Sequence, residues 1–196
     1  MNKYNKYLII LILLFATAAC GGETQSSGES AGEEEQTQTA TAETQAEYDA
    51  PGPFLERLEE GTEHYLMLSS ALVEDNREEA VRYSGLMRET LADADTDALS
   101  DEALQVWSEK WAIIDTRARA LEEAADLESQ RYEFEFLSEA MIELVEGFDP
   151  LSFDVYVQRC PMVRDGSADW LSRNEDILNP YHGDSMLTCG SVIREL

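Results

Sequence analysis

Two cysteines near the end of the chain each have a methionine close by. Cys160 lies two residues before Met162 in the run CPM, and Met186 lies three residues before Cys189 in the run MLTCG. Thiolate and thioether sulfur are soft ligands that prefer Cu(I), and thiolate also binds Zn(II). The four sulfur atoms therefore predict a soft-metal site, with Cu(I) as the metal.

One histidine lies close to this sulfur set. His182 lies four residues before Met186, and an imidazole nitrogen is a common ligand of copper and zinc. We therefore include His182 as a further candidate ligand.

The first twenty residues predict where the protein is located. Lys3 and Lys6 precede an apolar run from Tyr7 to Phe15, which is followed by ATAAC, whose cysteine is Cys20. A basic start, a short apolar segment and small residues before a cysteine are typical of a lipoprotein signal, and the run is too short for a permanent transmembrane helix. We expect residues 1–19 to be removed and the lipid on Cys20 to anchor the protein to a membrane of the cell envelope.

The remaining cysteines also have a second interpretation. Cys160 and Cys189 are an even pair, which in an oxidising envelope compartment favours a structural disulfide. A disulfide does not require methionines nearby, whereas a soft-metal site does gain ligands from them. Methionine is, however, also a common core side chain. The pattern leaves both interpretations open: a metal site, or a Cys160–Cys189 disulfide.

Composition changes sharply between the signal and the rest of the chain. Residues 20–50 contain no Lys or Arg and few apolar side chains, so they cannot bury enough surface to offset the entropy of ordering. We expect a disordered acidic tether. The net charge of −27 would repel nucleic acid and anionic headgroups, which excludes nucleic acid as a partner and favours solubility.

Residues 51–149 predict four helices, because apolar residues recur every three or four positions. Asp75, Ser100 and Asp126 are expected to cap the second, third and fourth helices, and Gly147 to end the fourth. The expected inward positions are Leu58, Tyr65, Leu68, Leu72, Val81, Leu86 or Met87, Leu91, Leu104, Trp107, Trp111, Ile114, Ala118, Phe134, Leu137, Met141, Ile142 and Val145. Short connections between long helices favour an antiparallel up-down bundle.

Residues 150–196 predict a small annex packed on the bundle. The segments 152–158 and 186–193 are short and compatible with β structure, and we expect them to pair like a β-hairpin with Cys160 and Cys189 near facing ends. The intervening segment is expected to be an irregular loop with turns at Gly166, Pro180 and Gly183. The predicted fold is therefore mainly α: a four-helix bundle followed by a two-strand annex.

The C-terminal motifs also carry a family resemblance. C-P-M, W-L, N-P-Y-x-G and M-L-x-C-G follow one another in this order, after the segments YLMLSSALVEDN and DLESQRYEFEFLSEAMIELVEGF. Over roughly residues 54–193 the chain resembles a bacterial domain family of unknown function, which occurs in secreted or lipid-anchored proteins and as an appendage of periplasmic adaptors of heavy-metal efflux pumps. The resemblance implies a metal-handling setting, with a heavy-metal efflux system as partner.

A second, shorter resemblance concerns the first motif alone. The run CPM is similar to the start of small heavy-metal-binding modules that open with Cys-Pro-Met-His-Pro. This chain departs from that pattern, since Val163 stands where the histidine would be.

Signatures of catalysis are lacking in the sequence. It contains no nucleophile elbow, Ser/His/Asp set, zinc-protease helix or phosphate-binding glycine loop, and a cysteine nucleophile would have only His182 nearby as a base. We therefore expect a non-enzymatic, lipid-anchored envelope protein that acts as a metal-binding or efflux-associated accessory module. The alternative is an interaction or scaffold domain closed by the Cys160–Cys189 disulfide.

Overall fold

The structure is a computed structural model that describes residues 46–164 and 166–196. The predicted signal peptide, the lipidation site Cys20 and most of the predicted tether lie outside the described residues.

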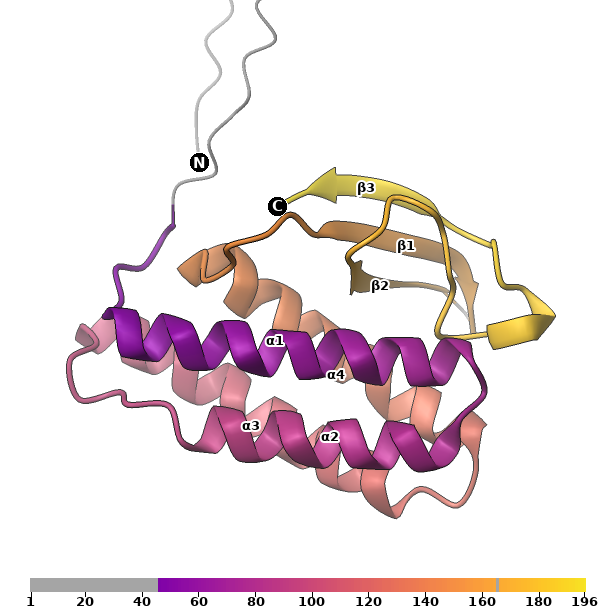
Figure 1. The fold of residues 1–196 in the computed structure, drawn as a ribbon, viewed down its shortest axis with the longest axis horizontal. Helices are drawn as coiled ribbons and strands as arrows, with labels where there is room; N and C mark the ends of the chain where they lie inside the picture. The colour runs from indigo at the N-terminus through magenta and orange to yellow at the C-terminus, as the bar shows by residue number, and fades with distance from the viewer. Residues whose placement is uncertain (1–45, 165) are drawn as a thin grey trace, which may run out of the picture. The chain divides into compact units, whose positions relative to one another are not determined.

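Four long helices form the larger part of the fold. They are α1 (Gly52–Val73), α2 (Arg77–Ala92), α3 (Asp101–Glu123) and α4 (Leu127–Phe148). Successive helices run in opposite directions and are joined by short turns (Figure 1). The predicted helical bundle is confirmed.

Two of the three predicted N-caps are confirmed. The Ser100 hydroxyl accepts a hydrogen bond from the Ala103 N–H at 3.2 Å, and the Asp126 carboxylate accepts one from the Ser129 N–H at 2.8 Å. Each cap satisfies a backbone donor that has no partner within its helix.

The cap predicted for α2 was placed one residue too early. Asn76, not Asp75, accepts from the Glu79 N–H at 3.2 Å. Asp75 instead has a left-handed backbone, with φ of 56°, and its carboxylate pairs with Arg131 of α4. The acidic side chain therefore connects the α1–α2 turn to α4.

The end predicted for α4 was also wrong. The helix continues through Gly147 to Phe148, and the left-handed residue Asp149, with φ of 46°, follows it. The Tyr48 N–H donates to the Gly147 carbonyl at 2.9 Å, and a Cβ added to Gly147 would lie 3.0 Å from the Tyr48 ring. Gly147 thus makes room for Tyr48 rather than ending the helix.

The bundle interior is formed by the apolar stripes that the sequence predicts, with one clear exception. Leu58, Tyr65 and Phe134 are fully buried, whereas Leu104 is 38% exposed. Leu104 lies in the first turn of α3, where its neighbour Ala103 is the buried residue.

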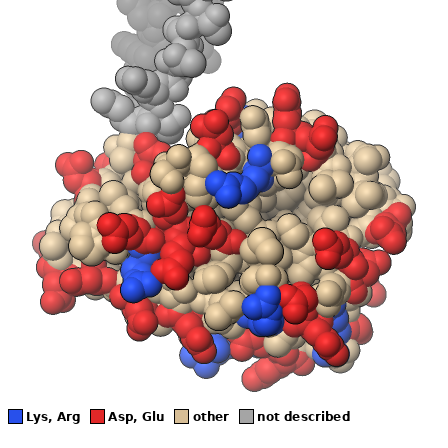
Figure 2. Space-filling model, viewed as in Figure 1, with Lys and Arg blue, Asp and Glu red and all other residues tan. Residues whose placement is uncertain are grey.

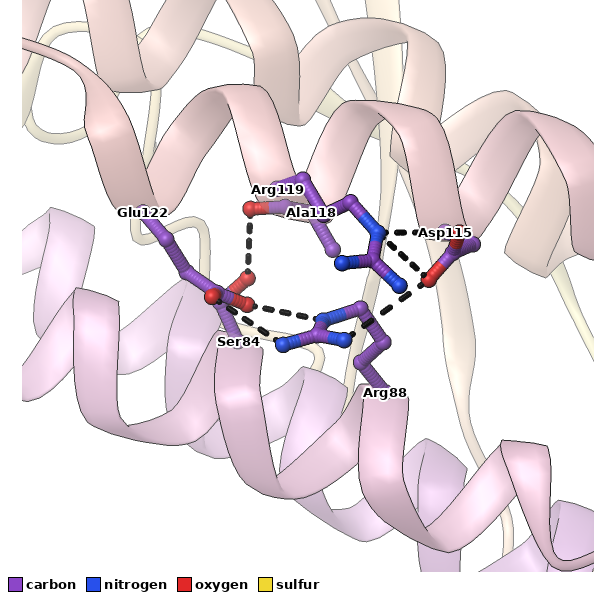
Figure 3. A network of polar contacts seen from close by, with 6 residues as sticks. All are labelled: Ser84, Arg88, Asp115, Ala118, Arg119 and Glu122. Atoms are coloured by element: carbon purple, nitrogen blue, oxygen red, sulfur yellow. Dashed lines mark hydrogen bonds and ion pairs between the residues drawn. The ribbon is translucent and has the colours of Figure 1, made fainter.

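A polar cluster joins α2 to α3 (Figure 3). The Arg88 guanidinium donates to both carboxylate oxygens of Glu122, at 3.1 and 3.2 Å, and lies 3.8 Å from the Asp115 carboxylate. The Ser84 hydroxyl donates to the Ala118 carbonyl at 3.2 Å. This half-buried cluster fixes how α2 and α3 lie against each other.

A three-stranded antiparallel sheet follows the helices, where the sequence predicted two strands. Its strands are β1 (Tyr156–Val163), β2 (Gly166–Ser172) and β3 (Ser191–Glu195), in the order β2-β1-β3. Strand β2, which includes the Trp170-Leu171 pair, was predicted as part of an irregular loop. A short 3₁₀ helix, η1 (Gly183–Ser185), lies between β2 and β3.

Two bulges interrupt the sheet. One extra residue of β1 lies between the pairs Cys160–Ala168 and Val163–Gly166. In β3, Ile193 is the extra residue between the partners of Val157 and Gln158.

The sheet packs along the side of the bundle formed by α1 and α4 (Figure 1). The hydroxyl of Tyr65 on α1 bonds with that of Ser138 on α4 at 2.8 Å, and it accepts the Leu171 N–H of β2 at 3.2 Å. One buried hydroxyl therefore connects two helices to the sheet.

The surface is strongly acidic. On the face shown in Figure 2, Asp and Glu side chains greatly outnumber Lys and Arg, and the whole chain has a net charge of −27. Within the described residues, no helix is both long enough and apolar enough to cross a membrane.

Candidate functional site

The two cysteines of the C-terminal segment meet in the folded protein. Their Sγ atoms lie 3.6 Å apart, although the two residues are 29 positions apart in the chain. This distance is well beyond a disulfide bond of about 2.05 Å, and both side chains are free thiols. Cys160 is fully buried and Cys189 is partly exposed.

The sheet topology explains why the thiols meet. Cys160 lies on the central strand β1, opposite Ala168 of β2. Cys189 comes two residues before Ser191, which pairs with Arg159 of β1. Antiparallel pairing of β3 with β1 therefore brings Cys189 beside its partner.

A buried asparagine fixes the backbone around Cys189. Asn179 is fully buried, and its Nδ2 donates to the Cys189 carbonyl at 2.8 Å. Its own backbone N–H donates to the Leu187 carbonyl at 2.8 Å, and its Oδ1 accepts from the Tyr181 N–H at 2.8 Å. Asn179 thus ties both ends of the 179–189 segment together.

Gly190 allows this segment to approach β1 closely. Its φ is 149°, and an added Cβ would lie 2.8 Å from the Arg159 carbonyl oxygen and 3.1 Å from the Trp170 ring. A backbone with this φ and no room for a side chain requires glycine. The residue after Cys189 therefore contributes to the short sulfur–sulfur distance.

The turn that carries Asn179 is in turn held by the bundle. Arg131 of α4 donates through Nε to the Pro180 carbonyl at 2.8 Å and through Nη2 to the Leu72 carbonyl at 2.7 Å. The ring of Tyr181 packs between Phe134 and Trp170, with centroids 5.7 and 5.9 Å away. The bundle thus serves as the support on which the cysteine segment rests.

These supporting residues were not predicted as parts of the site. N-P-Y-x-G was visible as a motif, but sequence alone did not show that its asparagine bonds to the backbone of Cys189. The signal that could have found it is a buried amide in a turn, since such a group must find hydrogen-bond partners.

The two methionines have different surroundings. The Met162 side chain is 57% exposed, and the β1 bulge lies between Cys160 and Val163, so the usual two-residue alternation does not carry Met162 to the face of Cys160. Met186 is partly buried and lies directly after η1.

His182 bonds to backbone in this structure. Its Nε2 lies 3.0 Å from the Met162 carbonyl oxygen. Among the residues that the structure describes, no three His, Cys, Asp or Glu side chains gather as a metal-binding group. Of the predicted ligands, Cys160 and Cys189 are the pair whose sulfur atoms are in contact.

The neighbouring thiol alters the chemistry of Cys189. Its hydrogen bond with Cys160, followed by burial and by the charge of Cys160, raises the pKa of the Cys189 thiol above its ordinary value. A metal ion bound by both sulfur atoms as thiolates would displace the thiol protons.

The chain is thus a mainly helical domain with a small C-terminal sheet, and two free thiols lie together at that sheet. Residues 62–152 match the family model described as "Protein of unknown function (DUF3347)". The match covers most of the bundle and ends before β1, so it includes neither Cys160 nor Cys189. Comparisons with the curated proteins and with the solved structures gave no match.

Proposed function

We propose that this protein binds a soft metal ion, Cu(I), reversibly through Cys160 and Cys189, and that it does so as a lipid-anchored accessory module of the cell envelope. The observation that carries the proposal is the 3.6 Å distance between two free thiols from separate segments. The function is binding, without turnover of a substrate.

The donor set supports a monovalent soft ion over zinc. Structural zinc sites take four ligands, whereas the described residues bring two thiols together, and thiolates select Cu(I). Met162 and Met186 are candidate additional ligands, but Met162 would have to turn inward from solvent.

The setting of the proposed function rests on the sequence. The ATAAC signal supports anchoring through Cys20, and the C-terminal motifs resemble a family found with heavy-metal efflux adaptors. The accessory role would be to store Cu(I) or to pass it to an efflux system.

The test is an anaerobic Cu(I) competition titration on the reduced mature chain, which starts at residue 20 and carries Cys20→Ala, so that Cys160 and Cys189 are its two thiols. We expect one Cu(I) per chain and at least a hundredfold loss of affinity in the Cys160→Ser, Cys189→Ser double variant. Equal affinity in the double variant would refute the proposal.

A second titration asks whether the methionines contribute. The Met162→Leu, Met186→Leu double variant is compared with Met67→Leu, an exposed methionine on α1 that lies 46% open to solvent. Weaker Cu(I) binding in the double variant alone would assign the methionines to the site, whereas unchanged binding would restrict it to the two thiols.

The competing function uses the same pair of cysteines. Sulfurs at 3.6 Å are also near enough to close a disulfide after a small shift, which supports an interaction domain with a covalently closed C-terminal segment. That function is favoured if the reduced protein does not bind Cu(I) and the protein isolated from the envelope is fully oxidised.

A further inference from the structure

We infer that the two cysteines form a redox gate: an internal Cys160–Cys189 disulfide and the metal-bound dithiolate are mutually exclusive states of one site. The disulfide part of this inference stands on the geometry alone, and the metal-release part rests on the proposed function.

The sulfur–sulfur distance lies between those of the two states. A disulfide requires about 2.05 Å, so closing it from 3.6 Å needs an approach of about 1.6 Å. Two thiolates on opposite sides of one metal ion, with bonds of about 2.3 Å, would stand about 4.6 Å apart. The observed pair can reach either arrangement by a shift on the order of 1–2 Å.

The Cys189 side is the part that can move. Cys160 lies on the central strand, with hydrogen-bonded neighbours on both sides, and is fully buried. Cys189 precedes β3 in a loop, where its N–H donates to the Met186 carbonyl at 3.0 Å and its carbonyl accepts from Asn179. Rotation of the partly exposed Cys189 side chain can therefore change the sulfur separation while the sheet stays in place.

The difference in exposure also gives the thiols different roles in oxidation. A low-molecular-weight disulfide, such as oxidised glutathione, can reach the partly exposed Cys189, whereas Cys160 is shielded. The Cys189 thiolate attacks one sulfur of the oxidant, which forms a mixed disulfide and releases one thiolate.

The second step closes the gate. The Cys160 thiolate attacks the Cys189 sulfur of the mixed disulfide, and the second thiolate leaves. In total the protein dithiol gives up two electrons and two protons, and the oxidant becomes two thiols. The sulfurs of the resulting disulfide are no longer thiolates, so the soft-ligand pair is lost.

Single variants of the mature Cys20→Ala chain can distinguish the roles of the two cysteines. Each variant is incubated with oxidised glutathione, and the reaction is followed by mass spectrometry. Cys160→Ser is expected to accumulate a mixed disulfide at Cys189. The Cys189→Ser variant is expected to react at least tenfold more slowly, because its remaining thiol, that of Cys160, is buried. Equal rates would refute the assignment of Cys189 as the entry point.

The gate itself is tested on the chain with both cysteines. We expect oxidised glutathione to remove both thiols, to form one intramolecular disulfide with an unchanged circular dichroism spectrum, and to lower Cu(I) affinity at least a hundredfold. Removal of the disulfide by a phosphine, followed by removal of the phosphine, should restore binding.

The outcomes distinguish the two proposals. Oxidised protein that still binds Cu(I) at full affinity, or a disulfide that forms only after unfolding, would overturn the gate. If instead the reduced protein binds no Cu(I) while the disulfide forms and opens in the folded state, then the proposed metal function fails and the redox pair remains.

Discussion

The side-chain amide of Asn179 and the backbone carbonyl of Cys189 are joined by a 2.8 Å hydrogen bond inside the protein. The nine residues between them include η1 and two of the candidate ligands, His182 and Met186. This bond therefore fixes the backbone that carries one of the two thiols from within its own segment.

Removing this amide is expected to affect both stability and metal binding. Asn179→Ala leaves the Cys189 carbonyl and the buried Tyr181 N–H without their partner, which costs about 1–3 kcal/mol of unfolding free energy. Chemical denaturation measures that loss, and the Cu(I) titration should show at least tenfold weaker binding. Gln105→Ala on the exposed face of α3 is the control, and an equal effect of both variants would contradict the role of Asn179.

A methyl group at Gly190 is expected to separate the thiols. Gly190→Ala would place its Cβ 2.8 Å from the Arg159 carbonyl oxygen at a φ of 149°, a strain of about 1–3 kcal/mol. We expect a lower melting temperature and slower disulfide closure with oxidised glutathione. Gly166→Ala, whose Cβ would meet no atom within 4 Å, should close at the normal rate.

Loss of one hydroxyl should weaken the attachment of the sheet. Tyr65→Phe leaves the Leu171 N–H and the Ser138 hydroxyl without their bonds to Tyr65, at a cost of about 1–3 kcal/mol. Hydrogen exchange should show the Leu171 amide losing protection. Tyr132→Phe is a matched control because that residue is 44% exposed. It should change neither the free energy of unfolding nor the protection of the Leu171 amide.

The α2–α3 ion pair shown in Figure 3 is expected to stabilise the bundle more than a surface pair does. A double-mutant cycle of Arg88→Ala and Glu122→Ala should give a coupling energy of about 1–2 kcal/mol, because the pair is half-buried and bidentate. The same cycle on Arg82 and Glu79, which are exposed, should give at most about 0.5 kcal/mol. Equal coupling energies would contradict this.

The N-cap of α4 predicts part of the loss of folding stability at low pH. The hydrogen bond from the Ser129 backbone N–H, followed by the one from its side chain, lowers the pKa of the Asp126 carboxyl in the folded state. Its stabilising contribution is therefore fully present above the pKa of the unfolded carboxyl and is lost as pH falls through the folded pKa.

The test for this cap compares two substitutions. Asp126→Ala should lower the melting temperature by a few degrees at neutral pH, and less under strong acid. Asp126→Asn keeps an acceptor that does not titrate, so its melting temperature should depend less on pH between those limits. An unchanged pH profile in both variants would show that Asp126 does not contribute.

The helices could be predicted from sequence because their signals are local. The apolar stripe that contains Leu58 and Tyr65, and the caps at Ser100 and Asp126, depend on residues within one or two helical turns. The errors arose where distant contacts decide: Asp75 pairs with Arg131 instead of capping, and Gly147 accommodates Tyr48 instead of ending α4.

The sheet was harder to predict for a similar reason. Strand β2 is short, and its consecutive residues Trp170 and Leu171 are both buried, although neighbouring side chains of a strand point to opposite faces. Its apolar residues therefore do not show the alternation that predicts a strand. The closeness of Cys160 and Cys189 could be anticipated, because they are the two cysteines that remain after Cys20 and they lie near facing ends of the segments expected to pair like a hairpin. The exposure of Met162 could not, since it depends on a bulge that only the strand register reveals.

The bulge at Ile193 has a consequence for how copies of the chain behave when crowded together. Strand β3 is one of the two edge strands of the described sheet, and its Val192 and Ile193 are exposed, a combination that often recruits further strands and seeds aggregates. The extra residue breaks the regular spacing of backbone donors and acceptors, and Arg194 and Glu195 add charge beside it. The sheet therefore ends in a strand that is a poor template for growth.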